Sequence, residues 1–175
     1  DTDRSRGLGD VYKRQTNNYA PVQLARYVTT IANEGNCYDL TLVNEIKNID
    51  GRTVYKSDNV PKNTVDLTDS QWAVIKQGMR QMVSEHTSPS ALINQINVNV
   101  AGKTGTAEED TTRPDHALFV SFAPYENPEV SVTCVIPHGY TSGNAEELAG
   151  MVYAYMYDPD KLDTLDITGN NQMSD

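Results

Sequence analysis

The sequence lacks the features that direct a protein to nucleic acid or into a membrane. Its 175 residues carry 14 Lys and Arg against 24 Asp and Glu, which gives a formal net charge of −10. So acidic a chain repels phosphate backbones and anionic lipid surfaces, and we expect no nucleic-acid partner. No apolar run approaches membrane-spanning length, and nothing in the chain reads as a signal peptide.

Cysteine is scarce as well, since the chain has only Cys37 and Cys134. Two cysteines do not make a disulfide framework, and the alternating apolar run around Cys134 favours a buried free thiol there. A bridge between the two stays open, because sequence alone does not show whether they approach each other. The three histidines are far apart in the sequence, and no His/Cys spacing matches a metal site. We therefore expect neither a metal nor a cofactor.

Apolar residues are fewer than usual, at 38% of the chain, against about 45–50% in typical globular proteins. The ends account for part of this deficit, because residues 1–14 and 158–175 are polar and show no apolar periodicity. We expect both ends to be mobile and accessible to proteases. Residues 15–157 suffice for one domain or a large piece of one.

The first half of the chain predicts two helices separated by a hairpin. Pro21 suits the first turn of a helix, and apolar residues recur at helical spacing as far as Ala32. Asp50-Gly51, between two short apolar runs, is a strong hairpin signal. Thr68 and Gln71 form a capping box for a second helix. The predicted buried stripe of that helix consists of Trp72, Ile75, Met79, Met82 and Val83.

The second half predicts three strands followed by a helix. The strands cover residues 98–106, 116–125 and 129–138, and the helix covers residues 143–159. Short links between strands favour an antiparallel sheet, so the predicted fold class is α+β, an antiparallel sheet covered by helices. The predicted apolar face of the last helix consists of Leu148, Met151, Val152 and Tyr155.

The run "VAGKTGTAEED", residues 100–110, carries the clearest functional signal. A phosphate-binding P-loop would need a glycine where Asn97 stands, and it would not be followed by the acidic run 108–110. The same Lys-Thr-Gly is one of the motifs of β-lactamases and penicillin-binding proteins. A lysine on an exposed strand is also often only a solubilising charge, so the tripeptide does not decide by itself.

Four segments in one order give that motif its context. They read "NNYAPVQLARYVTTIANEG", "QWAVIKQGMRQMV", "VAGKTGTAE" and "HALFVSFAPYENPEVSVTCVI". The stretch from about residue 15 to residue 157 resembles the C-terminal part of the transpeptidase domain of a class B penicillin-binding protein. The resemblance implies a partial penicillin-binding transpeptidase fold.

In that family a serine attacks the penultimate D-Ala carbonyl of a peptidoglycan stem peptide, and the acyl group then passes to an amine of a neighbouring stem. β-Lactams mimic the D-Ala-D-Ala end and block the serine. The resemblance implies that Lys103 orients a substrate carboxylate and assists proton transfer, and that Thr104 and Thr106 bind this carboxylate. It also implies that the Thr106 N–H is an oxyanion donor and that Gly105 keeps the strand open to substrate. The catalytic set is then Lys103 and Thr106, and the substrate-binding set adds Thr104 and Gly105. His116, which begins the next strand, is interpreted as a structural residue flanking the site.

The nucleophile of the family is missing from this sequence, because no S-x-x-K occurs in it. Ser57-Asp58-Asn59 spells the second family motif but lies downstream of the helix that it should precede, so we reject it as a coincidence. Ser142-Gly143-Asn144 is the other near match. We expect both motifs to precede residue 1 in the parent protein. Residues 1–14 match no family pattern that we can place, and we interpret them as a foreign or artefactual join to a truncated gene. The chain should therefore be inactive alone and expose part of its apolar surface.

The implied parent is a peptidoglycan D,D-transpeptidase at the extracytoplasmic face of the bacterial cell membrane. Its implied partners are stem peptides, β-lactams, the missing N-terminal half of the domain and a cell-wall synthesis complex. Two alternatives stay open: a fragment of a serine β-lactamase or D,D-carboxypeptidase, and a non-catalytic cell-wall sensor or scaffold with the same fold. Sequence upstream of residue 1 would separate them.

Overall fold

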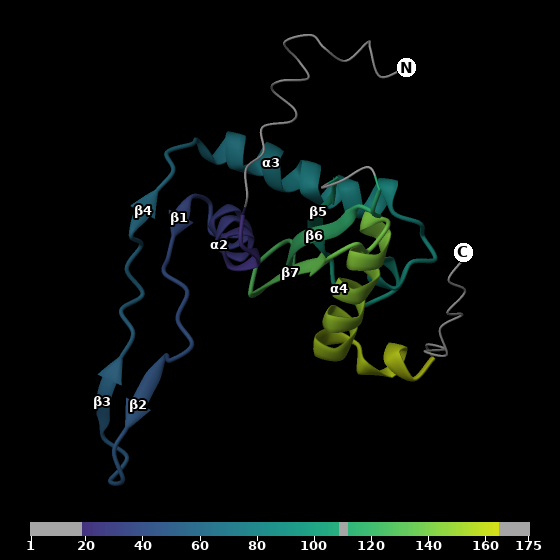
Figure 1. Cartoon of the computed structure of the whole chain (residues 1–175). Helices are drawn as coiled ribbons and strands as arrows, with labels where there is room; N and C mark the ends of the chain where they lie inside the picture. Colours follow the sequence, from purple (N-terminus) through teal and green to yellow (C-terminus); the bar gives the residue numbers. More distant parts are fainter. Residues whose placement is uncertain (1–18, 109–111, 165–175) are drawn as a thin grey trace.

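A computed structural model describes residues 19–108 and 112–164 of the chain (Figure 1). The predicted mobile segment 1–14 and the end of the tail, residues 165–175, lie outside the described residues. The helices and strands are α2 (Pro21–Ala32), β1 (Asn36–Cys37), β2 (Glu45–Lys47), β3 (Thr53–Lys56), β4 (Asn63–Thr64), α3 (Asp69–Gln81), η2 (Met82–His86), η3 (Leu92–Asn94), β5 (Ala101–Ala107), β6 (His116–Ala123), β7 (Val130–Ile136), α4 (Ser142–Tyr157) and η4 (Pro159–Thr164).

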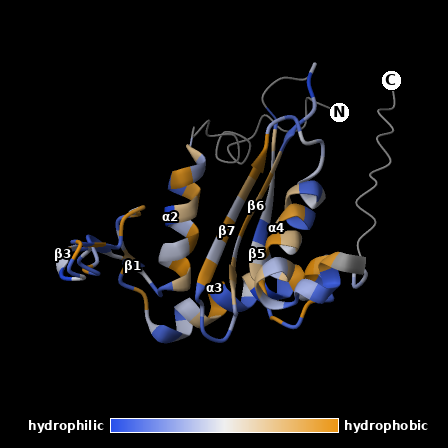
Figure 2. Cartoon of the chain, turned by 90° about the horizontal axis from the view of Figure 1, so that it is seen from below, coloured by the Kyte–Doolittle hydropathy of each residue, from blue (hydrophilic) through white to orange (hydrophobic). Residues whose placement is uncertain are grey.

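The predicted α+β architecture is confirmed. Strands β5, β6 and β7 form an antiparallel sheet in that order, in which Val120 of β6 lies opposite both Lys103 of β5 and Thr133 of β7. Helices cover the sheet on both faces, and Figure 2 shows it between α2 and α4. Because side chains alternate along a strand, β6 sends Phe122 into a core with α2 and α3, and Phe119 into the core that includes α4.

Helix α4 packs against the sheet through a different face from the predicted one. Leu148 and Tyr155 of the predicted face are 46% and 74% exposed, whereas Met151 packs against the core as predicted. The prediction was wrong because it followed the large apolar residues, whereas close packing here depends on small ones. A Cβ on Gly150 would lie 3.2 Å from the Ile93 backbone nitrogen, so the helix sits close to η3. The buried residues of α4 are Ala145, Glu146, Ala149, Gly150, Tyr153 and Ala154.

Tyr153 of α4 makes a polar contact with the sheet. Its hydroxyl lies 3.0 Å from the Ser121 hydroxyl of β6, and both residues are fully buried. Burial raises the pKa of the Tyr153 phenol, because the charged form would lose its hydration. This bond satisfies a buried polar pair and fixes α4 against β6.

The second helix follows its predicted signals closely. Thr68 caps α3, and the capping box with Gln71 is present. Trp72, Met79 and Val83 are buried as predicted, whereas Ile75 is exposed. The helix continues into the π-helical turn η2, which no sequence signal predicts.

The tail predicted to begin at residue 158 is ordered at its start. Residues Pro159–Thr164 form the 3-10 helix η4, and Leu162 packs against the core that includes α4. The Asp158 carboxylate accepts a hydrogen bond from the Asn97 backbone N–H at 3.2 Å. The packed part of the chain therefore extends past the predicted boundary at residue 157.

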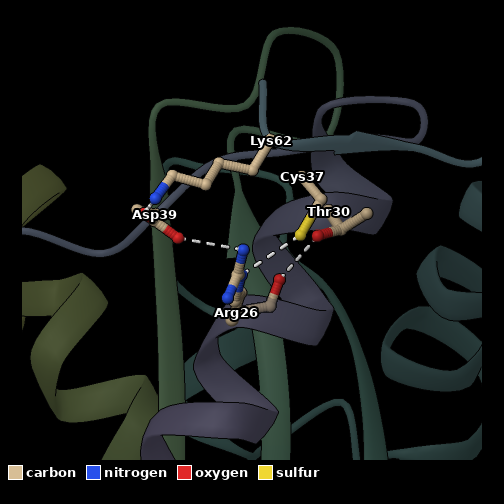
Figure 3. Close-up of polar contacts among 5 residues, drawn as sticks. All are labelled: Arg26, Thr30, Cys37, Asp39 and Lys62. Carbon is tan, nitrogen blue, oxygen red and sulfur yellow. Dashed lines mark hydrogen bonds and ion pairs between the residues drawn. The ribbon is translucent and has the colours of Figure 1, made fainter. Parts of the chain in front are cut away.

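Residues 38–62, which we call the arm, project from the sheet and carry the hairpin β2–β3 at their tip (Figure 1). The predicted Asp50-Gly51 turn is confirmed, with Gly51 at a φ of 78°. Strands β1 and β4 pair at the base of the arm. There Asp39 forms ion pairs with Arg26 of α2, at 3.1 Å, and with Lys62 (Figure 3). These contacts fasten the arm to α2.

Both cysteines are free thiols. Cys134 is buried on β7, as predicted, and Cys37 is half-buried at the base of the arm. The Cys37 sulfur accepts a hydrogen bond from Arg26 Nε at 3.2 Å (Figure 3). Within the ranges described above, no helix is both long and apolar enough to span a bilayer.

Candidate functional site

Strand β5 carries the Lys-Thr-Gly run, and its beginning is anchored on both sides. Ala101 is buried under α2 and α3, and a Cβ on Gly102 would come within 2.5 Å of the Phe119 ring. Arg80 of α3 donates to the Val100 carbonyl at 3.1 Å. The residues that precede the Lys-Thr-Gly motif therefore fix its position through their packing. Gly102, which we did not predict as important, is the glycine of this strand that the core requires.

The outer edge of β5 is unpaired within the described residues. Beyond Gly102 the strand becomes accessible, and Lys103 and Thr106 are exposed. Lys103 Nζ donates to the Thr104 carbonyl at 3.0 Å and forms no ion pair with another described residue. A Cβ on Gly105 would meet Leu118 at 3.5 Å, which is an ordinary contact. The chain itself thus gives no steric reason for glycine at position 105.

A cavity of about 640 Å³ opens beside this strand, within the size range of ligand sites. The structure brings Lys103 and Thr104 together in it, and the Thr104 hydroxyl lies 3.9 Å from Met82 Sδ. Gly105 and Thr106 are not among its lining residues. The cavity is lined by Gly78, Met82, His86, Thr87, Lys103, Thr104, Ser142, Gly143 and Glu146.

Glu146 is the lining residue that sequence reasoning missed most clearly. Its side chain is buried and accepts a hydrogen bond from the Thr87 hydroxyl, which joins the segment after η2 to the first turns of α4. A buried carboxylate needs such a partner. No local signal could have paired these two residues, because they are far apart in the sequence. A second cavity of about 480 Å³ adjoins the first and shares Glu146 and Thr87 with it.

The two S-x-N sequences lie in different places. Ser57 is at the foot of the β2–β3 hairpin, where its N–H donates to Asn44, and it does not line the cavity. Ser142 and Gly143 do line the cavity, at the start of α4, whereas the Asn144 amide turns away to the Gly139 carbonyl at 2.8 Å. Among the residues that the structure describes, no cluster of His, Cys, Asp or Glu has the geometry of a metal site.

This arrangement can receive an extended anionic ligand. An unpaired strand edge offers backbone N–H and C=O groups to a peptide-like chain, which would add to the sheet as a further strand. The Lys103 ammonium and the Thr104 hydroxyl belong to residues that line the cavity, and both groups are suited to a carboxylate. His116 begins β6 opposite Ala107 and lies outside the cavity lining.

Comparisons with known proteins point to one family. A family model described as the penicillin binding protein transpeptidase domain matches residues 5–156. Its range begins at residue 5, inside the segment 1–14. The interpretation of that segment as a foreign join stays a prediction. Penicillin-binding protein 2B of Streptococcus pneumoniae is 35% identical over 71% of this chain and 20% of its own length. The peptidoglycan D,D-transpeptidase MrdA of Haemophilus influenzae is 30% identical over 85% of this chain and 25% of its own.

Solved structures show the same likeness. The structure of penicillin-binding protein 2B from Streptococcus pneumoniae superposes with a TM-score of 0.67 at 30% identity, covering 85% of this chain and 26% of that one. The structure of Pseudomonas aeruginosa PBP2 in complex with WCK 5153 gives a TM-score of 0.63 at 32% identity, covering 79% and 30%. The chain thus spans between one fifth and one third of the proteins that it resembles.

Proposed function

Because the chain belongs to the penicillin binding protein transpeptidase domain family, we propose that it is the C-terminal part of a peptidoglycan D,D-transpeptidase. The parent cross-links stem peptides through a serine acyl-enzyme, and β-lactams acylate the same serine. The serine comes from sequence outside this chain, since no S-x-x-K occurs within it. Residues 1–175 are therefore inactive by themselves.

The observation that carries this proposal is the placement of Lys103. Its ammonium lies on an unpaired strand edge beside a cavity and has no carboxylate partner among the described residues. A stem peptide or a β-lactam brings a carboxylate to that edge. Lys103 and the hydroxyls of Thr104 and Thr106 receive it, and the Thr106 N–H donates to the acyl carbonyl. The same lysine, next to the serine of the parent, assists proton transfer.

We place the parent at the extracytoplasmic face of the bacterial membrane, within a cell-wall synthesis complex. Support comes from relatives named peptidoglycan D,D-transpeptidase. The N-terminal half of the domain is the first partner of this chain, because it supplies the nucleophile and the opposite wall of the cleft.

Labelling with a fluorescent penicillin tests the proposal. After denaturing electrophoresis, the full-length parent should carry a stoichiometric label that unlabelled penicillin prevents, whereas residues 1–175 should carry none. Heat-denatured parent is the control for non-specific attachment. An unlabelled parent would contradict the proposed function. A labelled 175-residue chain would show that the nucleophile lies within it, and rapid loss of the label from the parent would favour the β-lactamase alternative.

A further inference from the structure

The turn between β7 and α4 is held in a strained conformation. His138 and Tyr140 have φ values of 53° and 65°, in the left-handed region that residues with a side chain seldom adopt. Between them, a Cβ on Gly139 would lie 2.8 Å from that of Ala117, so the turn also presses closely on β6. Such a conformation persists only where its surroundings hold it, and it is often found beside a functional site.

The residues at the start of β6 and just before it hold this turn, through the Asp115 backbone and the His116 side chain. The His138 N–H donates to His116 Nδ1 at 3.0 Å, and the Tyr140 N–H donates to the Asp115 carbonyl at 3.1 Å. The two imidazole rings are in contact, with centroids 4.8 Å apart. His138 Nδ1 lies 3.1 Å from the Pro114 carbonyl, which can only accept, so this nitrogen carries the proton. His116 Nδ1, in contrast, acts as an acceptor.

These contacts join two segments that each lead to residues lining the cavity. His116 lies opposite Ala107, at the end of the strand that carries Lys103. The turn itself leads through the N-cap residue Thr141 into Ser142 and Gly143, which line the same cavity as Lys103. A change at the His116–His138 contact would therefore alter the position of the first turn of α4 relative to β5.

We propose that His116 is a positioning residue for the transpeptidase site. By accepting the His138 N–H, it holds the strained turn and sets the separation between the start of α4 and the Lys103 strand. It lies outside the cavity lining and acts through the turn. The consequence for acylation rests on the proposed function, whereas the contact itself is a property of this chain.

Amide hydrogen exchange in the isotopically labelled 175-residue chain tests the contact without any catalysis. His116→Leu removes the acceptor, and His116→Asn places an oxygen near the position of Nδ1. In His116→Leu the amides of His138, Tyr140 and Gly143 should exchange about twofold to tenfold faster, the effect of losing one hydrogen bond. His116→Asn should restore most of the protection. The Phe119 and Phe122 amides are internal controls and should exchange as in the wild type.

Two results would overturn the positioning role within this chain. One is unchanged exchange of the turn in His116→Leu. The other is equal loss of protection in His116→Leu and His116→Asn, which would mean that ring packing matters and the acceptor does not. If His116→Leu does not fold, a scalar coupling across the N–H···N bond between the His138 amide and His116 Nδ1 decides the matter in the wild type, and its absence refutes the proposal.

The parent enzyme tests the link to function separately. Acylation by a labelled penicillin should be slower in His116→Leu and should recover in His116→Asn, a rescue that a general loss of stability would not produce. If exchange responds as expected but acylation does not, the contact stands and its role in positioning the site is wrong.

Discussion

Phe119 in the sheet and Ile49 at the tip of the arm are large apolar residues with opposite surroundings. Phe119 is 0% exposed, whereas Ile49 is 102% exposed and Leu42, at the base of the hairpin, is 105% exposed. Strand β6 is covered on both faces, so its register is fixed by burial. The β2–β3 hairpin has no covering layer, and an isolated two-stranded hairpin is marginally stable in water.

The arm is held by polar contacts in place of a core. Asn48 accepts hydrogen bonds from Asp50 and Arg52 at the turn, at 3.1 Å and 2.8 Å. At the base, the ion pairs of Asp39 fasten the arm to α2. Because exposed ion pairs contribute about 0–1 kcal/mol each, the arm adds little to the stability of the fold. The motif lies in the part of the chain whose geometry is set by burial, as a site that must keep its shape requires.

The two regions should differ most in the free energy of unfolding that is lost when a large apolar side chain is removed. Phe119→Ala should lower the free energy of unfolding by about 3–5 kcal/mol, because the ring fills the space above Gly102. Ile49→Ala should change it by less than about 0.5 kcal/mol. Urea unfolding followed by the fluorescence of Trp72, the one tryptophan of the chain, measures both. Similar losses in the two variants would mean that the arm belongs to the core.

The lysines of the two regions should differ in function. Lys103→Ala in the full-length parent removes a charge-assisted hydrogen bond worth about 1.5–3 kcal/mol, so acylation by a labelled penicillin should slow about tenfold to a hundredfold. Lys47→Ala is the matched control, because that lysine is an exposed arm residue paired with Glu45 at 3.1 Å. Melting temperatures should stay unchanged in both. If Lys103→Ala acylates at the wild-type rate, the site assignment is wrong.

The sequence predicts the elements of both regions better than their packing. The capping box of Thr68 and the Asp50-Gly51 turn are local signals, and the structure contains both. The orientation of α4 could not be predicted in this way, because the close approach at Gly150 depends on η3, which no pattern indicates. Amphipathicity selects the face with the largest apolar residues, and in α4 that face is exposed except at Met151.

In the candidate site, too, some residues could be predicted from the sequence and others could not. Lys103 and Thr104 could be found from a motif, because their spacing is local. The partners that shape their surroundings could not, since Glu146 meets Thr87 and His138 meets His116 only through the register of the strands and the docking of α4. Sequence thus predicts the groups that perform the chemistry, whereas the contacts that position them require the folded chain.

The two cysteines give the smallest expected difference between the arm and the sheet, a difference in thiol pKa. Cys134 lies in the sheet, where burial raises the pKa of its thiol. Cys37 lies at the base of the arm, where the Thr30 hydroxyl and the Arg26 guanidinium lower the pKa of its thiol. The Thr30 hydroxyl already donates to the Arg26 carbonyl at 2.8 Å. We therefore take Arg26, whose Nε lies 3.2 Å from the sulfur and whose charge is permanent, as the residue to change.

Iodoacetamide alkylation, followed by mass spectrometry across a pH series, measures the difference. Cys37 should react at a lower pH than a free thiol, and Cys134 should react only when the chain unfolds, because the thiolate is the nucleophile. Arg26→Met should move the Cys37 profile to higher pH, whereas Arg52→Met, at the tip of the arm, should leave it in place. A thiol whose pKa is lower in the folded chain than in the unfolded chain stabilises the folded state. This stabilisation is fully present above the pKa of the unfolded thiol, and it is lost as the pH falls through the pKa of the folded thiol. Stability should therefore rise slightly with pH across that window in the wild type and less in Arg26→Met. Equal alkylation profiles for Cys37 and Cys134 would contradict the contrast between the arm and the sheet at this position.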